Sequence, residues 1–184
     1  MKVLIIYAHS QPTSFNGALL RTAVDTLEAQ GHEVRVSDLY AMNFNPVASA
    51  ADFKVRRFEG HLQYDREQKH AVEHRSFSDD IQAEIDKVMW CDLLILQFPL
   101  WWYSAPAILK GWFDRVFANG LMYGHFGRFD KGGMRDKRAM VSTTTAAFPA
   151  WLMKAASWVT STPCCGTCST GRSPMWVSTC SNRL

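Results

Sequence analysis

The feature that most constrains the fold is the alternation of apolar segments with amphipathic ones over the first 145 residues. The segments Lys2–Ala8 (KVLIIYA) and Asp92–Phe98 (DLLILQF) are almost continuously apolar, which is typical of strands buried in a parallel sheet. The elements expected in chain order are a strand at Lys2–Ala8, a helix at Phe15–Gln30, a strand at Glu33–Ser37, a helix at Phe77–Trp90, a strand at Asp92–Phe98, a helix at Pro106–Phe117 and a strand at Arg138–Ser142. This order predicts an α/β fold, a doubly wound parallel sheet with helices on both faces in three layers.

The connections between these elements carry local signals of their own. Ser14 or Thr13 is a candidate N-cap for the first helix, and Ser76 or Ser78 for the second. The stretch from Tyr40 to His74 is polar and irregular, so it is expected to be a long loop, and loops of that length in compact domains are usually functional or flexible.

Composition separates the last 39 residues from the rest of the chain. A length of 184 residues with 47% hydrophobic residues fits one folded domain and excludes a disordered chain. All 17 acidic residues and 17 of the 20 basic ones precede residue 146, so the net charge of +3 belongs entirely to residues 146–184. We therefore divide the chain into a domain at residues 1–145 and a tail at residues 146–184 that is not a domain.

The lengths of the apolar stretches and the sequence pattern at the N-terminus indicate where in the cell the protein is expected. No apolar stretch approaches the roughly 20 residues that a membrane-spanning helix needs, and Met1 leads into a strand pattern and not a signal peptide. We expect a cytoplasmic protein without membrane insertion and without a nucleic-acid partner.

Three loops follow the carboxyl ends of expected strands, where open parallel sheets bind ligands. His9–Asn16 is rich in hydroxyl and amide groups and feeds a helix N-terminus, so it is a phosphate site or simply an ordinary N-cap. It lacks the GxGxxG and GK[ST] patterns, which disfavours a Rossmann dehydrogenase and an NTPase. Pro99–Tyr103 places three aromatic residues together, either to stack on a flat ligand or to cover the helix behind them. Val141–Thr145 offers hydroxyl groups to a ribityl or pyrophosphate chain.

Several of these segments occur together in one known family. The matching segments are His9–Ser10, Thr13–Asn16, Ser37–Pro46 (SDLYAMNFNP), Asp79–Ile81, Gln97–Tyr103 (QFPLWWY), Pro106–Phe117 (PAILKGWFDRVF) and Asp130–Gly132. With them the chain resembles the FAD-dependent NAD(P)H:quinone oxidoreductases of the flavodoxin-like fold, the DT-diaphorase type, over nearly all of residues 2–145. The resemblance implies a flavoenzyme that transfers a hydride from NAD(P)H to FAD and then two electrons to a quinone, in a ping-pong sequence.

The resemblance also implies roles for individual residues. The adenosine-phosphate part of FAD is expected at the first loop, and the isoalloxazine ring at the loop after the third strand. Thr144 and Thr145 match the threonines that precede a flavin-binding loop in the family. The cofactor-binding residues so implied are His9, Phe15, Asn16, Gln63, Pro99, Leu100, Trp101, Trp102, Tyr103, Thr144 and Thr145. Nicotinamide and quinone are expected to alternate near Tyr123 and His125, the latter a departure from the aromatic hydroxyl usual in the family. Taken alone, both residues are more typical of a surface. The family closes this pocket at a dimer interface, so a homodimer is implied.

The resemblance stops at Ala146–Ala147, where the family has Gly-Gly. With synonymous codons, Met175–Leu184 read in a displaced frame gives VGFDVLEPF, similar to the fifth strand of the family. We therefore interpret the segment after about residue 145 as frameshifted, with the parallel fifth strand and the last helix missing and the fourth strand left as a sheet edge. Such a chain is expected to retain FAD weakly and to have little activity. The alternative is a divergent tail with a redox or metal site at Cys164–Cys168, but a lone C-x-x-C is poor evidence for zinc, and no metal site is predicted.

Two other functions remain open from the sequence. One is an FMN-dependent azoreductase or nitroreductase-like enzyme of the same fold. The other is an ancillary subunit that regulates a potassium-efflux antiporter, a role of bacterial relatives. The bound flavin would distinguish the first alternative, and co-purification with a membrane protein the second.

Overall fold

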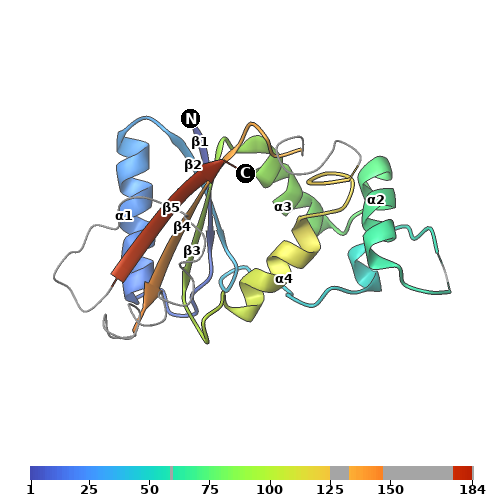
Figure 1. The fold of residues 1–184 in the computed structure, drawn as a ribbon, viewed down its shortest axis with the longest axis horizontal. Helices are drawn as coiled ribbons and strands as arrows, with labels where there is room; N and C mark the ends of the chain where they lie inside the picture. The colour runs from blue at the N-terminus through green and yellow to red at the C-terminus, as the bar shows by residue number, and fades with distance from the viewer. Residues whose placement is uncertain (59, 125–132, 147–175, 184) are drawn as a thin grey trace, which may run out of the picture.

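The computed structural model describes residues 1–58, 60–124, 133–146 and 176–183, and it arranges their strands in one sheet (Figure 1). The elements in chain order are β1 (Lys2–Tyr7), α1 (Phe15–Ala29), β2 (Glu33–Asp38), the 3₁₀ turn η1 (Ala50–Asp52), α2 (Tyr64–His74), α3 (Asp79–Trp90), β3 (Leu93–Pro99), α4 (Ala107–Val116), β4 (Arg138–Thr145) and β5 (Trp176–Arg183). The strand order is β2-β1-β3-β4-β5, and β1 to β4 are mutually parallel. The predicted α/β class is confirmed.

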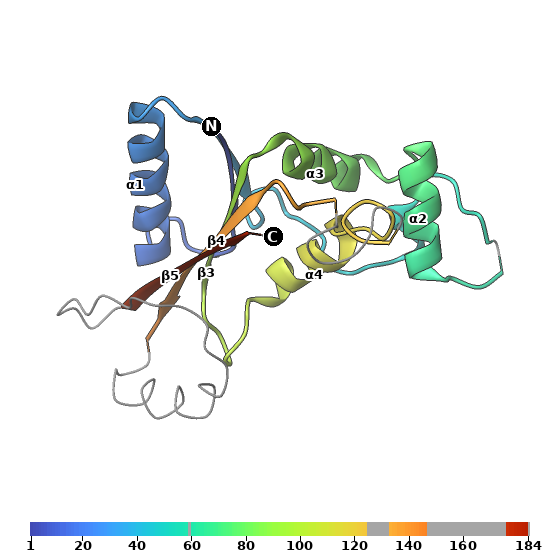
Figure 2. The same ribbon diagram turned by 45° about the horizontal axis from the view of Figure 1, so that its top comes forward.

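Helices cover both faces of the sheet (Figure 2). α1 lies on one side, α3 and α4 lie on the other, and α2 lies beyond them, away from the sheet. The smaller core, between the sheet and α1, is built on Val3, Ile5 and Ile95, and the larger one lies on the α3 and α4 side. No helix in the described part of the chain is long and apolar enough to cross a membrane.

The first helix shows why the sequence folds as it does locally. Ser14 is the N-cap, and its Oγ accepts a hydrogen bond from the Gly17 amide at 3.1 Å. Gly17 lies so close to the preceding loop that a Cβ would stand 2.0 Å from the Pro12 carbonyl oxygen, so only glycine fits there. The helix ends at Ala29, before Gly31 with φ +78°.

The connection after β2 is more ordered than the sequence predicts. Instead of an irregular loop from Tyr40 to His74, it contains η1 and α2. The backbone of this connection packs closely against α4: a Cβ on Gly111 would stand 2.1 Å from the Pro46 carbonyl oxygen. The expectation of one long irregular loop was wrong, because a few buried polar residues in this stretch, such as Asp52 and Glu67, make tertiary contacts that order it.

Buried charge holds this connection to α4. The Arg115 guanidinium, 3% exposed, donates to Asp52 at 3.0 Å and to the Asn45 carbonyl at 2.7 Å, and lies 2.9 Å from an Asp80 oxygen. The Tyr64 hydroxyl donates to Asp52 at 2.5 Å. Burial lowers the pKa of Arg115, but the hydrogen bond and charge of Asp52, with Asp80, outweigh it and hold the pKa above its ordinary value.

Two buried glutamates have contacts of the same kind. Glu84 on α3 accepts from the Trp112 indole at 2.9 Å, the Ser37 hydroxyl at 3.1 Å and the Lys87 ammonium at 2.6 Å. Glu67 on α2 accepts from two backbone amides, those of Arg57 at 2.8 Å and Phe58 at 3.0 Å. The contacts of Glu84 join α3 to α4 and β2, and those of Glu67 join α2 to the segment that precedes it.

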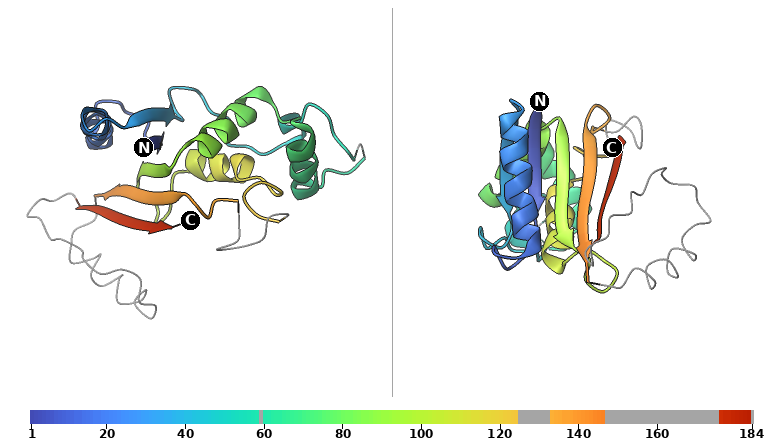
Figure 3. Two further views of the ribbon diagram at one scale, coloured as in Figure 1. Left: turned by 90° about the horizontal axis from the view of Figure 1, so that it is seen from above. Right: turned by 90° about the vertical axis from the view of Figure 1, so that its left-hand side faces the viewer.

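The edge of the sheet differs from expectation. β5 pairs antiparallel with β4, with Trp176 opposite Thr145 and Arg183 opposite Arg138, and Figure 3 shows it beside β4. The expectation that β4 forms an exposed edge was wrong, because the tail supplies a strand that takes up its free backbone groups. β5 is antiparallel and so is not the parallel fifth strand of a doubly wound sheet. The expected loss of the last helix concerns residues 147–175 and 184, which lie outside the described residues.

Other boundaries shift by a few residues. β4 continues to Thr145, so Val141–Thr145 is strand and not loop, because each residue from Leu93 to Pro99 on β3 has a partner from Arg138 to Thr144 on β4. α3 begins at Asp79 with Ser78 as N-cap, although no side-chain capping hydrogen bond forms there.

Candidate functional site

A pocket of about 230 Å³ lies at the carboxyl ends of β1, β3 and β4. The chain leaves β1 and β3 toward opposite faces of the sheet, to α1 and to α4, so the two loops diverge and leave a crevice between them. The lining residues are His9, Ser14, Phe15, Asn16, Pro99, Leu100, Trp101, Thr144, Thr145 and Ala146. The structure thus brings together eight of the predicted cofactor residues from three segments far apart in the sequence.

The first loop presents hydrogen-bond donors to this pocket. The Gln11 amide donates to Nδ1 of His9 at 3.0 Å, so in the neutral ring the proton resides on Nε2, which is then a donor. First-turn amides of a helix have no partner within it, and those of α1 begin at Phe15. Together with the positive end of the helix dipole, these groups favour an anion such as a phosphate.

Hydrogen bonds tie the three segments to one another. Asn16 Nδ2 donates to Thr144 Oγ1 at 2.5 Å, and the Leu100 amide donates to the Thr144 carbonyl at 2.7 Å. Gln97 on β3 donates through Nε2 to the Asn16 carbonyl at 2.8 Å. The walls of the pocket are therefore fixed relative to one another before any ligand binds.

One buried polar atom in these walls has no partner within the described residues. Asn16 is 3% exposed, and its Oδ1 accepts no hydrogen bond from the part of the chain that the structure describes. A buried carbonyl oxygen without a partner is destabilising, and such groups are uncommon in native proteins. Because Asn16 lines the pocket, a ligand donor is the simplest partner for this oxygen.

The aromatic segment after β3 forms a tight turn. The backbones of Trp101 and Ser104 exchange two hydrogen bonds of 3.0 Å, and the two residues between them have positive φ, +51° at Trp102 and +59° at Tyr103. Large side chains rarely adopt this conformation, and strain of this kind clusters at functional sites. Trp101 lines the pocket with its ring centroid 6.0 Å from that of His9, whereas Trp102 and Tyr103 are 96% and 80% exposed.

Some predicted site residues lie elsewhere. Trp102 and Tyr103 do not line the pocket, and Gln63 precedes α2 on the outer side of the molecule. Tyr123, 44% exposed, follows α4, which begins after β3 and carries the chain away from the pocket. His125 lies outside the described residues.

The sequence reasoning missed two contributors. Gln97 is 2% exposed and positions Asn16, and the signal was available as one polar residue in an otherwise apolar strand. Ser14 belongs to the predicted phosphate loop His9–Asn16 but was not among the predicted cofactor residues, and the structure shows that it both caps α1 and lines the pocket.

The pocket is lined by amide, hydroxyl, imidazole and apolar groups, and it lies where the chain leaves neighbouring strands toward opposite faces of the sheet. With the strand order β2-β1-β3-β4, this arrangement defines a flavodoxin-like α/β protein. The flavodoxin-like fold family matches residues 1–158, and the chain belongs to this family.

Similar proteins narrow the class further. The human protein named ribosyldihydronicotinamide dehydrogenase (quinone) is 48% identical over 145 residues, which are 78% of this chain and 63% of the human one. NAD(P)H dehydrogenase (quinone) 1 of Cavia porcellus is 47% identical over 145 residues, 78% of this chain and 53% of that protein. The chain therefore spans less than two thirds of the length of these relatives.

Solved structures of similar proteins also resemble this chain. A Klebsiella pneumoniae protein described as a candidate quinone reductase superimposes with a TM-score of 0.75 at 43% identity, covering 80% of this chain and 60% of the other. The NAD(P)H:quinone oxidoreductase of Methanothermobacter marburgensis gives a TM-score of 0.64 at 30% identity, covering 85% and 69%.

Proposed function

We propose that this chain is a flavin-dependent NAD(P)H:quinone oxidoreductase with FAD as its cofactor. The observation that carries the proposal is the pocket at the ends of β1, β3 and β4, in which eight residues of the expected flavin site converge. Relatives at 47–48% identity over 145 residues are named quinone-dependent dehydrogenases. The antiporter-subunit and azoreductase alternatives have no comparable support.

The residues present fit a flavin. Donors at His9 and the start of α1 and apolar side chains at Pro99, Leu100 and Trp101 line the same pocket. Its 230 Å³ is below the roughly 300–1,000 Å³ usual for pockets that enclose a small ligand, so it accommodates only part of FAD. When bound, the flavin supplies the hydride and two-electron chemistry that the side chains of this pocket lack.

The protein's own contribution is position and electrostatics. The start of α1, with the His9 Nε2 donor, would hold the phosphates, and Pro99–Trp101 would exclude water from one face of the flat ring. Asn16 Oδ1 would be the acceptor for a ligand donor, because Nδ2 of the same amide is already held by Thr144. Thr145 adds a second hydroxyl side chain to the β4 side of the pocket.

A homodimer accounts for the position of Tyr123. Within one chain, the ten residues of α4 separate the pocket from the segment that carries Tyr123, a length of about 15 Å. In the proposed dimer a second copy brings Tyr123 and His125 over the exposed face of the ring, where nicotinamide and quinone alternate. The homodimer, these two roles and the cytoplasmic location are parts of the proposal.

We also propose that residues 1–145 form the flavin-binding domain and that the segment from about residue 146 onward is translated from a displaced frame. Identity to the human relative extends over 145 residues, and the displaced frame yields a sequence similar to the family. Sequencing the gene tests this: a single-base insertion or deletion near codon 145 must restore the family frame.

The function is tested with the purified chain beside its frame-restored version. We expect flavin absorbance in the restored protein, with a released cofactor of the mass of FAD, and quinone-dependent oxidation of NAD(P)H. We expect weak flavin retention and little turnover in the chain as it stands. A released cofactor of the mass of FMN contradicts the FAD assignment, and a restored protein that binds no flavin contradicts the function.

A further inference from the structure

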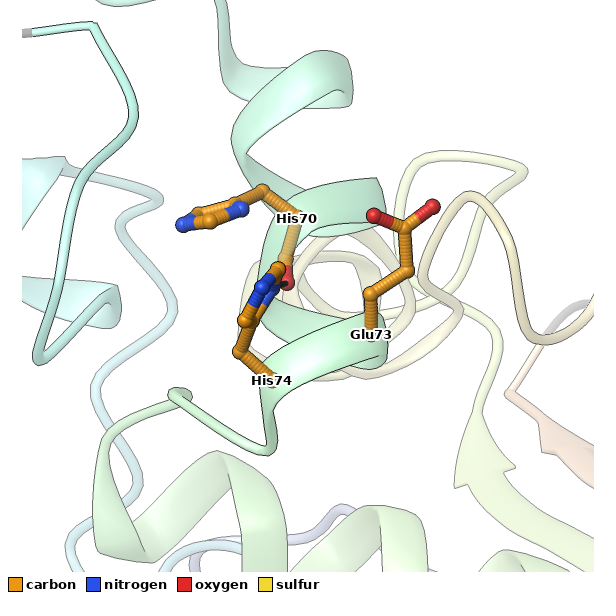
Figure 4. A group of neighbouring side chains, drawn as sticks. All are labelled: His70, Glu73 and His74. Atoms are coloured by element: carbon orange, nitrogen blue, oxygen red, sulfur yellow. Dashed lines mark hydrogen bonds between the residues drawn. The ribbon is translucent and has the colours of Figure 1, made fainter.

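The last two turns of α2 carry three side chains with metal-binding atoms, His70, Glu73 and His74 (Figure 4). Positions i, i+3 and i+4 of a helix are neighbours on its surface. We propose that these residues bind a divalent transition-metal ion such as Zn²⁺, at a site remote from the flavin pocket and independent of the proposed oxidoreductase function.

The geometry is close to that of a metal site. One ligand atom from each of the three residues lies within 4.8 Å of the others, and the two imidazole rings have centroids 4.1 Å apart. Two ligands of a tetrahedral zinc ion stand roughly 3.4 Å apart, given metal–ligand distances near 2.1 Å. Small side-chain rotations close this difference, and the residues are free to make them because Glu73 and His74 are exposed.

One contact already orients a ligand. Nδ1 of His74 lies 2.9 Å from the His70 carbonyl oxygen. Since a carbonyl only accepts, Nδ1 carries the proton in this contact and Nε2 keeps its lone pair for a metal. Metal-bound histidines typically donate their second ring nitrogen to a carbonyl or carboxylate in this way. A capping role explains the contact of His74 but not the approach of the His70 ring and of Glu73.

The chemical types of the three ligand groups indicate which metal ions the site would bind. Two imidazoles and one carboxylate suit Zn²⁺, Ni²⁺, Co²⁺ or Cu²⁺ and not Mg²⁺ or Ca²⁺, which prefer oxygen ligands. Three protein ligands leave one tetrahedral position for water, which can reach the exposed site. Arg66, one turn before His70, adds positive charge nearby, so we expect micromolar and not nanomolar affinity.

A bound ion would link the last two turns of α2. This helix ends at His74, before Arg75 in the left-handed conformation, and it carries the Tyr64 and Glu67 contacts that hold the long connection. Because binding to the folded state alone stabilises it, the ion should raise the midpoint of thermal unfolding.

The test is a calorimetric titration of the full chain with ZnCl₂, after the thiols are alkylated with iodoacetamide so that Cys164, Cys165, Cys168 and Cys180 cannot compete. We expect one equivalent to bind. The double variant His70→Ala/His74→Ala should lose about 100-fold or more in affinity and Glu73→Gln about 10-fold, since each removes a direct ligand. The matched control His61→Ala removes an exposed histidine outside the cluster and should bind as the wild type does.

A second measurement does not depend on the variants folding. Zn²⁺ should protect His70 and His74 of the wild-type chain from diethylpyrocarbonate, read by peptide mass, and leave His61 reactive. Equal affinity of the wild type and the double variant, binding by the wild type only at millimolar Zn²⁺, or no protection of His70 and His74 would each overturn the proposal.

Discussion

The pocket at the ends of the strands and the interior between α2, α3 and α4 differ in the hydrogen-bond partners of their buried side-chain oxygen atoms. In the interior, the Asp52, Glu67 and Glu84 carboxylates each accept several hydrogen bonds from within the chain. At the pocket, Asn16 Oδ1 is buried and accepts no hydrogen bond from the described residues. The turn that follows Trp101 holds two bulky exposed residues, Trp102 and Tyr103, at positive φ beside the pocket.

The buried carboxylates that the chain pairs with donors stabilise the fold, and we expect the unpaired oxygen at the pocket to bind a ligand. Its place in the pocket wall carries this expectation, because Arg115 Nε and Ser76 Oγ in the interior also lack partners among the described residues.

The largest expected effect is in the interior. Arg115→Met removes the ion-pair partner of the buried Asp52 and of the partly exposed Asp80, and it leaves the Asp52 carboxylate uncompensated, so the free energy of unfolding should fall by about 3–5 kcal/mol. Urea denaturation measures this. The matched control Lys110→Met breaks an exposed pair on the same helix and should cost at most about 0.5 kcal/mol. Equal losses in the two variants would remove the distinction between buried and exposed pairs.

A smaller effect is expected at Glu84. Trp112→Phe keeps an aromatic ring but removes the indole N–H that donates to Glu84, so unfolding should become easier by about 1.5–3 kcal/mol. Trp90→Phe is the control, because the Trp90 ring contacts Arg35 and Lys2 only through its face. Both are read by chemical denaturation, and an unchanged Trp112→Phe variant would show that Glu84 needs no indole donor.

In the turn beside the pocket, substitution of Tyr103 should stabilise the protein. Tyr103→Asn places a residue that tolerates positive φ at an exposed position, so the free energy of unfolding should rise by about 1 kcal/mol. Tyr103→Phe keeps the strain and should have no effect. A destabilised Tyr103→Asn variant would show that the ring contributes to the fold and not to binding.

Asn16→Ala should scarcely change stability but should weaken flavin binding. The variant loses the hydrogen bond to Thr144 and also removes an unsatisfied buried oxygen, and the two effects largely cancel, leaving less than about 1 kcal/mol. Flavin affinity in the frame-restored protein, followed by absorbance, should fall about 10-fold or more, as expected when a hydrogen bond of about 1.4 kcal/mol is lost. A large loss of stability with unchanged flavin binding would place Asn16 with the interior residues.

The smallest effect is a pH dependence. Burial raises the pKa of Glu67, but the amides of Arg57 and Phe58 and the charge of Arg56 outweigh it and hold the pKa below its ordinary value. A lowered folded-state pKa contributes stability above the unfolded value, near 4.3, and this contribution is lost as the pH falls further. Glu67→Gln should therefore show a shallower decline of the unfolding midpoint between pH 5 and pH 3. A decline as steep as that of the wild type would assign the acid sensitivity to other groups, such as Asp80, whose pKa is also lowered.

Much of the fold was predictable because its signals are local. Apolar runs and helical periodicity located β1, β3, α1 and α4 within a few residues, since these patterns follow directly from burial. The long connection was missed because the residues that order it, Asp52 and Arg115, are 63 positions apart and are individually unremarkable polar residues. Eight of the ten residues that line the pocket were predicted, since they follow strand ends and match the family. Gln97 left a signal that was not used, and the separation of Tyr123 from the pocket left none.

The sequence by itself determined the class of fold, the order of its strands along the chain and the three segments that build the pocket, because burial and backbone hydrogen bonding act through periodic patterns. Tertiary structure decided which of those side chains face the pocket, where α2 forms, that β5 pairs with β4, and that His70, Glu73 and His74 meet. These depend on contacts between distant residues, whose energies no local pattern records.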